Sequence, residues 1–142
     1  MPEPRTFHMT TARRFGNRVL GPLIRLGVVP GTYVLTVPGR RSGKPRSTPV
    51  TLVDGRYLVA PYGPVDWVRN VRAAPTVTLS RRGRAVEYTV REVSADEAGP
   101  VLKRYVALAK VTRPYFRAAP DAPPAEFAAE ADRHPVFELI RP

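Results

Sequence analysis

The chain has 142 residues, no cysteine, two histidines and a formal net charge of +11 at pH 7. This length suits one domain, 1–142, with a core of its own, and the lack of cysteine excludes disulfides and thiolate chemistry. With two histidines, a zinc or haem site would need mainly carboxylate ligands, so no metal site is expected. The 23 Lys and Arg residues outnumber the 12 Asp and Glu residues, which predicts an anionic partner.

The N-terminal part is expected to be an arm followed by a helix. Residues 1–11 show no periodicity, whereas apolar residues recur at helical spacing over 12–26 with arginines on the other faces. We expect this basic amphipathic helix to pack on the rest of the domain, with peripheral contact to an anionic membrane as the alternative. No stretch approaches 18 apolar residues, so the expected location is the cytoplasm.

Strand patterns dominate the middle of the chain. Short alternating or β-branched runs predict strands, and Gly-containing pairs between them (Ser42-Gly43, Asp54-Gly55, Arg82-Gly83) predict tight turns. The predicted strands are 32–37, 47–53, 56–61, 75–80, 84–93 and 136–140.

Three helices are predicted between or after these strands. Residues 65–74 show helical spacing and stop at Pro75, and Ser94 with Glu97 forms a capping box ahead of a helix body at 100–110. Residues 111–125 are proline-rich and irregular, and a short helix is expected at 125–133. The pattern predicts a mainly β (α+β) fold in which six or so antiparallel strands close into a barrel, with three to four short helices.

The segment VPGRRSGKPRSTPV, residues 37–50, places four cations within seven positions. It is not a nucleotide P-loop, because three residues rather than four separate its glycines and a proline follows Lys44. Such closely spaced like charges repel one another unless an anion lies among them. The turn is therefore interpreted as an anion clamp, and the alternative is a solvated hairpin tip that keeps the sheet edge soluble.

A second motif, APYGPVDWVRNVRAAPTVTL, covers residues 60–79. A strand end, a turn with Gly63 and a helix start follow one another, an arrangement that lets a flat ligand approach the backbone. The alternative is a plain strand-to-helix turn, with Trp67 as a core residue.

Together these two motifs resemble the deazaflavin (coenzyme F420)-dependent nitroreductase family. The matching pieces are Thr36 to Arg46, residues 60–63, and Trp67, Asn70, Ala73 and Pro75, and residues 132–142 resemble that family's closing strand. The likeness covers residue 15 to the C-terminus.

The resemblance implies a split β-barrel, like that of flavin-binding reductases, with the deazaflavin in a groove. It implies that the basic turn binds the phosphate and oligoglutamate tail of F420, and that the second motif lies along the ring and linker. The first set is Arg40, Arg41, Ser42, Gly43, Lys44, Pro45 and Arg46, and the second is Ala60, Pro61, Tyr62, Gly63, Asp66, Trp67, Val68, Arg69 and Asn70.

The implied reaction is hydride transfer from reduced F420 to a small apolar acceptor such as a quinone, an enone or a nitro compound. Tyr115 is the first candidate for lining the acceptor pocket and supplying a proton, and Tyr105 is the second, with a core role as its alternative. His134 is interpreted as a turn residue rather than a base, and His8 lies in the arm.

Other functions stay open at this point. The same fold could hold FMN or haem, although FMN has no glutamate tail and would leave some of the cations at 40–46 unused. A nucleic-acid-binding module fits the charge but lacks an RNP-type aromatic pattern, zinc spacing or helix-turn-helix pattern, so no specific nucleic acid is expected. A monomer is preferred over a homodimer.

Overall fold

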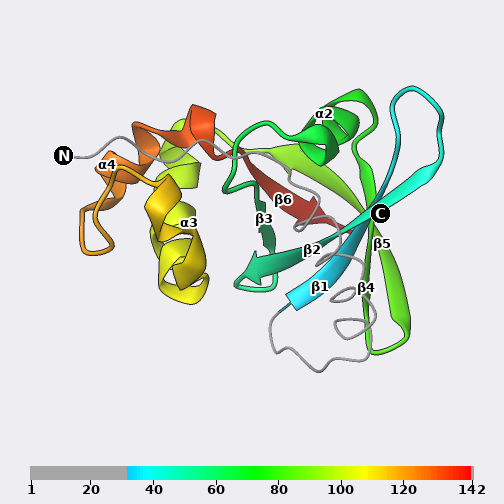
Figure 1. Ribbon diagram of the computed structural model, residues 1–142, viewed down its shortest axis with the longest axis horizontal. Helices are drawn as coiled ribbons and strands as arrows, with labels where there is room; N and C mark the ends of the chain where they lie inside the picture. The colour runs from blue at the N-terminus through cyan, green and yellow to red at the C-terminus, as the bar shows by residue number, and fades with distance from the viewer. Residues whose placement is uncertain (1–31, 142) are drawn as a thin grey trace.

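Six antiparallel strands close into a barrel in the computed structural model, which describes residues 32–141 (Figure 1). Neighbouring strands follow the order β1-β2-β3-β6-β5-β4, so pairing of β1 with β4 completes the closure. The predicted barrel is confirmed, while the predicted arm at 1–11 and helix at 12–26 lie outside the described residues. The strands are β1 Thr32–Pro38, β2 Pro45–Val53, β3 Tyr57–Val59, β4 Thr76–Arg81, β5 Arg84–Glu92 and β6 Val136–Ile140.

Two of the predicted hairpin turns are confirmed by their backbone angles. Asp54 and Gly55 have φ of 54° and 62°, and Arg82 and Gly83 have φ of 53° and 76°. Two consecutive residues with positive φ are typical of turns that match the twist of antiparallel strands. Arg82-Gly83 is a two-residue turn, because Arg81 pairs with Arg84, whereas residues 54–56 connect β2 to β3.

The first hairpin is wider than the two-residue turn predicted at Ser42-Gly43. Its loop spans residues 39–44 and is closed by the Gly39 amide, which donates to the Lys44 carbonyl at 2.8 Å. The last rung of the ladder pairs Pro38 with Pro45. Because neither proline has an N–H to donate, strand pairing ends there and leaves a broad loop.

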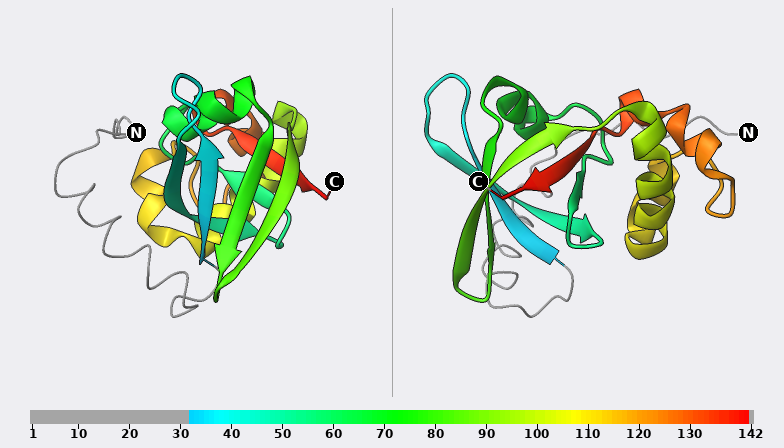
Figure 2. Two further views of the ribbon diagram at one scale, coloured as in Figure 1. Left: turned by 90° about the vertical axis from the view of Figure 1, so that its right-hand side faces the viewer. Right: turned by 180° about the vertical axis from the view of Figure 1, so that it is seen from behind.

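Helices gather on one side of the barrel and across its top (Figures 1 and 2). They are α2 Asp66–Ala73, α3 Ala95–Leu108 and α4 Pro124–Ala128, with 3-10 segments at Lys110–Tyr115 and Ala131–Arg133. The start predicted for the body of α3 is wrong, because the helix begins at Ala95 and holds Pro100 inside. Ser94 sets this start, since its Oγ accepts from the Glu97 amide at 3.3 Å.

The strand alternation creates two cores. Leu52, Leu58 and Phe137 point into the barrel, whereas their neighbours Val59 and Val136 face outward and pack with the apolar side chains of α3 and α4. Short strands thus serve both cores and fix the helical layer against β2, β3 and β6. Among residues 32–141, no helix is long and apolar enough to span a membrane; the membrane contact considered for residues 11–26 lies outside this part.

Candidate cofactor and substrate site

The basic turn is tied to helix α2 by Asn70. The Asn70 Oδ1 accepts from the Arg40 backbone amide at 3.0 Å and from Arg40 Nη1 at 2.9 Å. Asn70 is only 3% exposed, so these bonds lie largely out of water. The loop and α2 stand side by side in both views (Figures 1 and 2). Two motifs that are separate in the sequence therefore form one surface.

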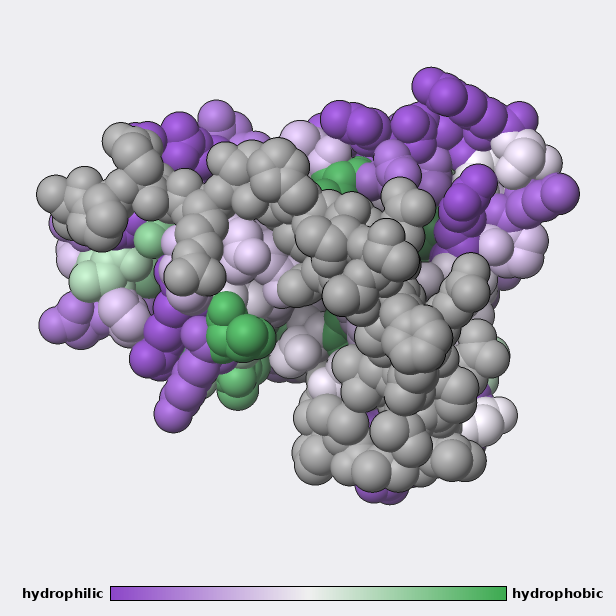
Figure 3. All heavy atoms as spheres, in the orientation of Figure 1, coloured by the Kyte–Doolittle hydropathy of each residue, from purple (hydrophilic) through white to green (hydrophobic). Residues whose placement is uncertain are grey.

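Three other cations of this turn are available to a ligand. Arg41, Lys44 and Arg46 are exposed and make no side-chain hydrogen bond or ion pair within residues 32–141. Figure 3 shows hydrophilic residues gathered at the corner of the molecule from which the turn projects. Arg40 differs from them, because it holds Asn70 and its Nη1 lies 3.8 Å from an Asp66 carboxylate oxygen.

Residues 60–63 connect β3 to α2 through a constrained backbone. The Ala60 amide donates to the Pro135 carbonyl at 2.8 Å, and the Gly63 amide lies 3.4 Å from the Ala60 carbonyl. Gly63 has φ of 102°, a conformation that a residue with a Cβ rarely adopts. Since Pro61 has no N–H, strand pairing stops here, and β3 is shorter than the predicted 56–61.

The predicted ligand residues on α2 have different surroundings. Asp66 and Arg69 are exposed, whereas Trp67 is half-buried with its ring 5.8 Å from that of Phe137. The Val68 side chain is fully buried in the barrel core, as is that of Ala60. We therefore expect Val68 and Ala60 to approach a ligand only through their backbone. At its far end α2 is held by Arg72, which donates to Glu92 at 2.9 and 2.7 Å.

The tyrosine predicted to serve the acceptor contacts the predicted cofactor segment. The rings of Tyr62 and Tyr115 meet edge to face, with centroids 4.8 Å apart. Both residues are half-buried, so the pair forms an aromatic surface that reaches solvent. Tyr105, by contrast, is 5% exposed in the core between the barrel and the helices. Burial raises the pKa of Tyr105, which makes its hydroxyl a poorer proton donor.

His134 has a larger role than the turn residue that the sequence suggests. It is buried two residues before β6 begins, with Nδ1 2.8 Å from the Pro61 carbonyl and Nε2 2.9 Å from Glu130 Oε1. Its ring stacks on Phe116 at 3.8 Å. Burial lowers the pKa of His134, and its hydrogen bonds to Glu130 and Pro61 oppose that shift. Glu130 belongs to no motif in the sequence, and its i, i+4 spacing from His134 is the one signal for it.

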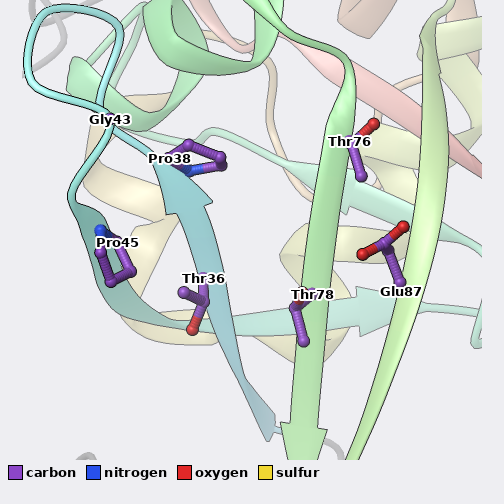
Figure 4. Close-up of a pocket in the computed structure, with 7 residues that line it drawn as sticks. All are labelled: Thr36, Pro38, Gly43, Pro45, Thr76, Thr78 and Glu87. Carbon is purple, nitrogen blue, oxygen red and sulfur yellow. The ribbon is translucent and has the colours of Figure 1, made fainter.

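A hollow of about 200 Å³ lies on the outer face of the barrel, on β1, β4 and β5 (Figure 4). The row Thr36, Thr78 and Glu87 crosses these three strands, and Gly43 and Pro45 of the basic turn also line the hollow. None of residues 60–63 lines this hollow. The Glu87 carboxylate there would repel an anionic group, so we do not assign the hollow to an anionic cofactor. Within the described residues, no cluster of histidines and acids could hold a metal ion.

Comparisons with known proteins show the family and the fold. The model of the F420H(2)-dependent quinone reductase family matches residues 5–118. The solved structure of an F420-H2 dependent reductase is 27% identical over 78% of this chain and 94% of that chain, with a TM-score of 0.52. A haem-binding protein from Mycobacterium smegmatis shares the fold at 12% identity, over 84% of this chain and 49% of that chain, with a TM-score of 0.54. No curated protein matches significantly.

A further similar structure bears on assembly. It is described as a domain-swapped dimer and is 26% identical over 90% of this chain and 96% of that chain, with a TM-score of 0.53. The preference for a monomer therefore finds no support in these comparisons.

Proposed function

The chain belongs to the F420H(2)-dependent quinone reductase family, and from this premise we propose that it transfers a hydride from reduced F420 to a quinone at the surface shared by the basic turn, residues 60–63 and Tyr115. Dependence on F420 and oxidoreductase activity follow from the family. Quinone as the acceptor and the roles of individual residues are the proposal.

One observation carries the assignment of the site: Asn70 joins the basic turn to α2. Because Asn70 Oδ1 accepts both Arg40 donors, the turn is fixed beside the helix that follows residues 60–63. A ligand with a polyanionic tail and a flat ring needs these two surfaces in a fixed relation.

The chemistry of the donor set fits F420. Arg41, Lys44 and Arg46 would hold the phosphate and glutamate carboxylates, because each is exposed and has no partner within residues 32–141. Each charge-assisted hydrogen bond contributes about 1.5–3 kcal/mol, so three would supply much of a micromolar affinity. FMN, with one phosphate, would use fewer of these cations. Residues 60–63 and the first turn of α2 would line the ring.

When bound, F420H2 supplies a hydride, so a quinone needs one further proton to become the hydroquinone. The chain's own residues then have two tasks, which are to orient the acceptor and to deliver that proton. The edge-to-face pair of Tyr62 and Tyr115 offers aromatic surface for a planar acceptor. The Tyr115 hydroxyl would donate the proton to the quinone oxygen. An enone or a nitro compound would use the same surface.

The proposal is tested by mixing the purified full chain with F420H2 and one acceptor at a time: a water-soluble naphthoquinone, a cyclic enone or a nitroaromatic compound. We expect the quinone to reoxidise the deazaflavin fastest, as followed by absorbance, and we expect the protein not to raise the rate above that of the protein-free mixture when FMNH2 replaces F420H2. Faster turnover of the enone or the nitro compound would contradict the acceptor assignment. Tight FMN binding without F420 binding would overturn the assigned function.

A further inference from the structure

A buried chain of hydrogen bonds connects the two halves of the proposed site. It runs from the Pro61 carbonyl through His134 to Glu130 and ends at the backbone amides of Arg117 and Ala118. We propose that the His134–Glu130 pair is a positioning device that sets residues 60–63, and with them the coenzyme ring, at a fixed distance from the segment carrying Tyr115. This proposal rests on the function proposed above.

The donors and acceptors fix the order of this series of hydrogen bonds. The Pro61 carbonyl can only accept, so His134 Nδ1 carries a hydrogen and donates at 2.8 Å. One further proton lies between His134 Nε2 and Glu130 Oε1, which are 2.9 Å apart. The Glu130 carboxylate also accepts from the Arg117 amide at 3.1 Å and from the Ala118 amide at 2.8 Å. Both nitrogens of the His134 ring and both carboxyl oxygens of Glu130 therefore have a hydrogen-bond partner.

Burial makes this series of hydrogen bonds rigid. The side chains of His134 and Glu130 are 3% and 7% exposed, so water competes little for their hydrogen bonds. Phe116 stacks on the His134 ring with an interplanar angle of 21°. The stacking fixes the plane of the ring, and the hydrogen bonds fix the positions of its two nitrogens. An imidazole held in this way has one orientation available to it.

The anchored residues flank the aromatic contact of the site. Pro61 directly precedes Tyr62, and Phe116 and Arg117 directly follow Tyr115. Each tyrosine of the Tyr62–Tyr115 contact, whose ring centroids are 4.8 Å apart, therefore has a neighbour in sequence that contacts the His134–Glu130 pair. Hydride transfer depends steeply on the separation and angle of donor and acceptor. Loss of the His134 and Glu130 hydrogen bonds would therefore slow the chemical step.

Kinetic variants test the proposal. His134→Phe keeps a ring that can stack on Phe116 and loses both hydrogen bonds. We expect kcat/KM for the quinone to fall at least tenfold, mainly through kcat, while the Kd of F420 changes less than threefold, because the basic turn is anchored by Asn70. Glu130→Gln keeps an oxygen acceptor for the two amides and gains an N–H donor to His134 Nε2. It should retain kcat/KM within threefold of the wild type.

Two outcomes would overturn the proposal. The first is unchanged kcat/KM in both His134→Phe and Glu130→Ala. The second is an equal loss of F420 affinity and of kcat in His134→Phe, which would indicate general disruption of the fold. If His134→Phe does not fold, the polar variants His134→Asn and His134→Gln replace it. Asn retains a donor toward Pro61 and Gln one toward Glu130, so each breaks a single link and should lower kcat on its own; normal kcat in both contradicts the proposal.

Amide hydrogen exchange tests the same coupling without the coenzyme, so it separates this proposal from the proposed function. In His134→Phe the Arg117 and Ala118 amides keep their Glu130 acceptor, yet we expect them to exchange at least tenfold faster. In Glu130→Ala the Gly63 amide, which does not touch Glu130, should also exchange faster. The coupling would be refuted if His134→Phe left the Arg117 and Ala118 amides unchanged and Glu130→Ala left the Gly63 amide unchanged, even with normal F420 turnover. Absent F420 turnover with coupled exchange would refute only the proposed function.

Discussion

Asn70 accepts two hydrogen bonds from Arg40, one from its backbone and one from its guanidinium, across 30 positions of the sequence. This relationship gives two cations of the basic turn different tasks. Arg40 fixes the turn to α2, whereas Arg41 extends into solvent, where an anionic ligand can reach it.

Replacing Asn70 with alanine is predicted to loosen the basic turn. Removal of a buried acceptor that serves two donors should lower the free energy of unfolding by about 1–3 kcal/mol. The Kd of F420 should rise about tenfold, because the cations lose their fixed position beside residues 60–63. Asn70→Asp retains an acceptor oxygen and is the matched control. Denaturant unfolding and fluorescence titration measure the two effects, and an unchanged Kd in Asn70→Ala would show that the tie does not serve the ligand.

The double variant Arg41→Ala/Lys44→Ala is predicted to weaken F420 binding at least tenfold, or at least about 1.4 kcal/mol. Stability should change little, because both side chains are exposed and unpaired within the described residues. The control Arg84→Ala/Lys110→Ala removes the same charge elsewhere on the surface. Equal weakening by both pairs would mean that net charge alone, rather than the turn, attracts the coenzyme. Arg40→Ala/Lys44→Ala should also weaken binding, but it breaks the Asn70 tie as well.

Tyr115→Phe is predicted to lower kcat for the quinone about 100-fold, as expected for loss of a general acid. The ring remains to pack on Tyr62, so the KM for the quinone should change little. Tyr105→Phe is the comparison, because that hydroxyl is buried and burial raises its pKa. Steady-state kinetics at saturating F420H2 distinguishes the two tyrosines. A larger loss in Tyr105→Phe would reverse their roles.

Gly99→Ala is predicted to destabilise the helical layer. A Cβ at Gly99 would lie 2.6 Å from the Pro124 carbonyl oxygen, which is backbone and cannot turn aside. Overpacking of this kind costs about 1–3 kcal/mol of unfolding free energy. Ala107→Ser adds one atom to an exposed position of the same helix and should change stability by about 0.5 kcal/mol or less. Thermal unfolding compares them, and equal melting temperatures would show that α4 moves to make room.

Stability is predicted to fall in mild acid through Glu97 and Glu138. Hydrogen bonds from Arg91 lower the pKa of both carboxyl groups, and Arg56 adds to the effect on Glu138. Because these pKa values lie below those of the unfolded chain, their stabilisation is complete at neutral pH and is lost as the pH falls below about 4.3.

Glu138→Gln should therefore lower the urea midpoint at about pH 7 and reduce its further drop at about pH 4. Glu126→Gln alters an exposed carboxylate without an ion pair in residues 32–141 and serves as the control. An identical pH dependence in Glu138→Gln and the wild type would exclude this network as its source.

The strands and their turns were largely predictable from sequence because they depend on neighbouring residues. The short, mostly apolar run VFELI predicts the observed bounds of β6, and the turns at Asp54-Gly55 and Arg82-Gly83 follow from local backbone preference. The predicted start of α3 at Pro100 is wrong, because proline is usual near a helix start but does not define it. The cap at Ser94 decides that start, and the helix accommodates the proline.

The same distinction holds for the site. By itself the sequence determined the charge of the basic turn, the glycine at 63 and the motifs that identify the family, since each is a property of a few adjacent residues. Only the tertiary structure decided that the Arg40 guanidinium donates a hydrogen bond to Asn70. It also decided that Tyr62 contacts Tyr115, and that His134 bonds both Glu130 and Pro61. The contacts of Arg40 with Asn70, of Tyr62 with Tyr115 and of His134 with Pro61 join distant segments, which only the folded domain brings together, whereas the spacing of Glu130 and His134 is local.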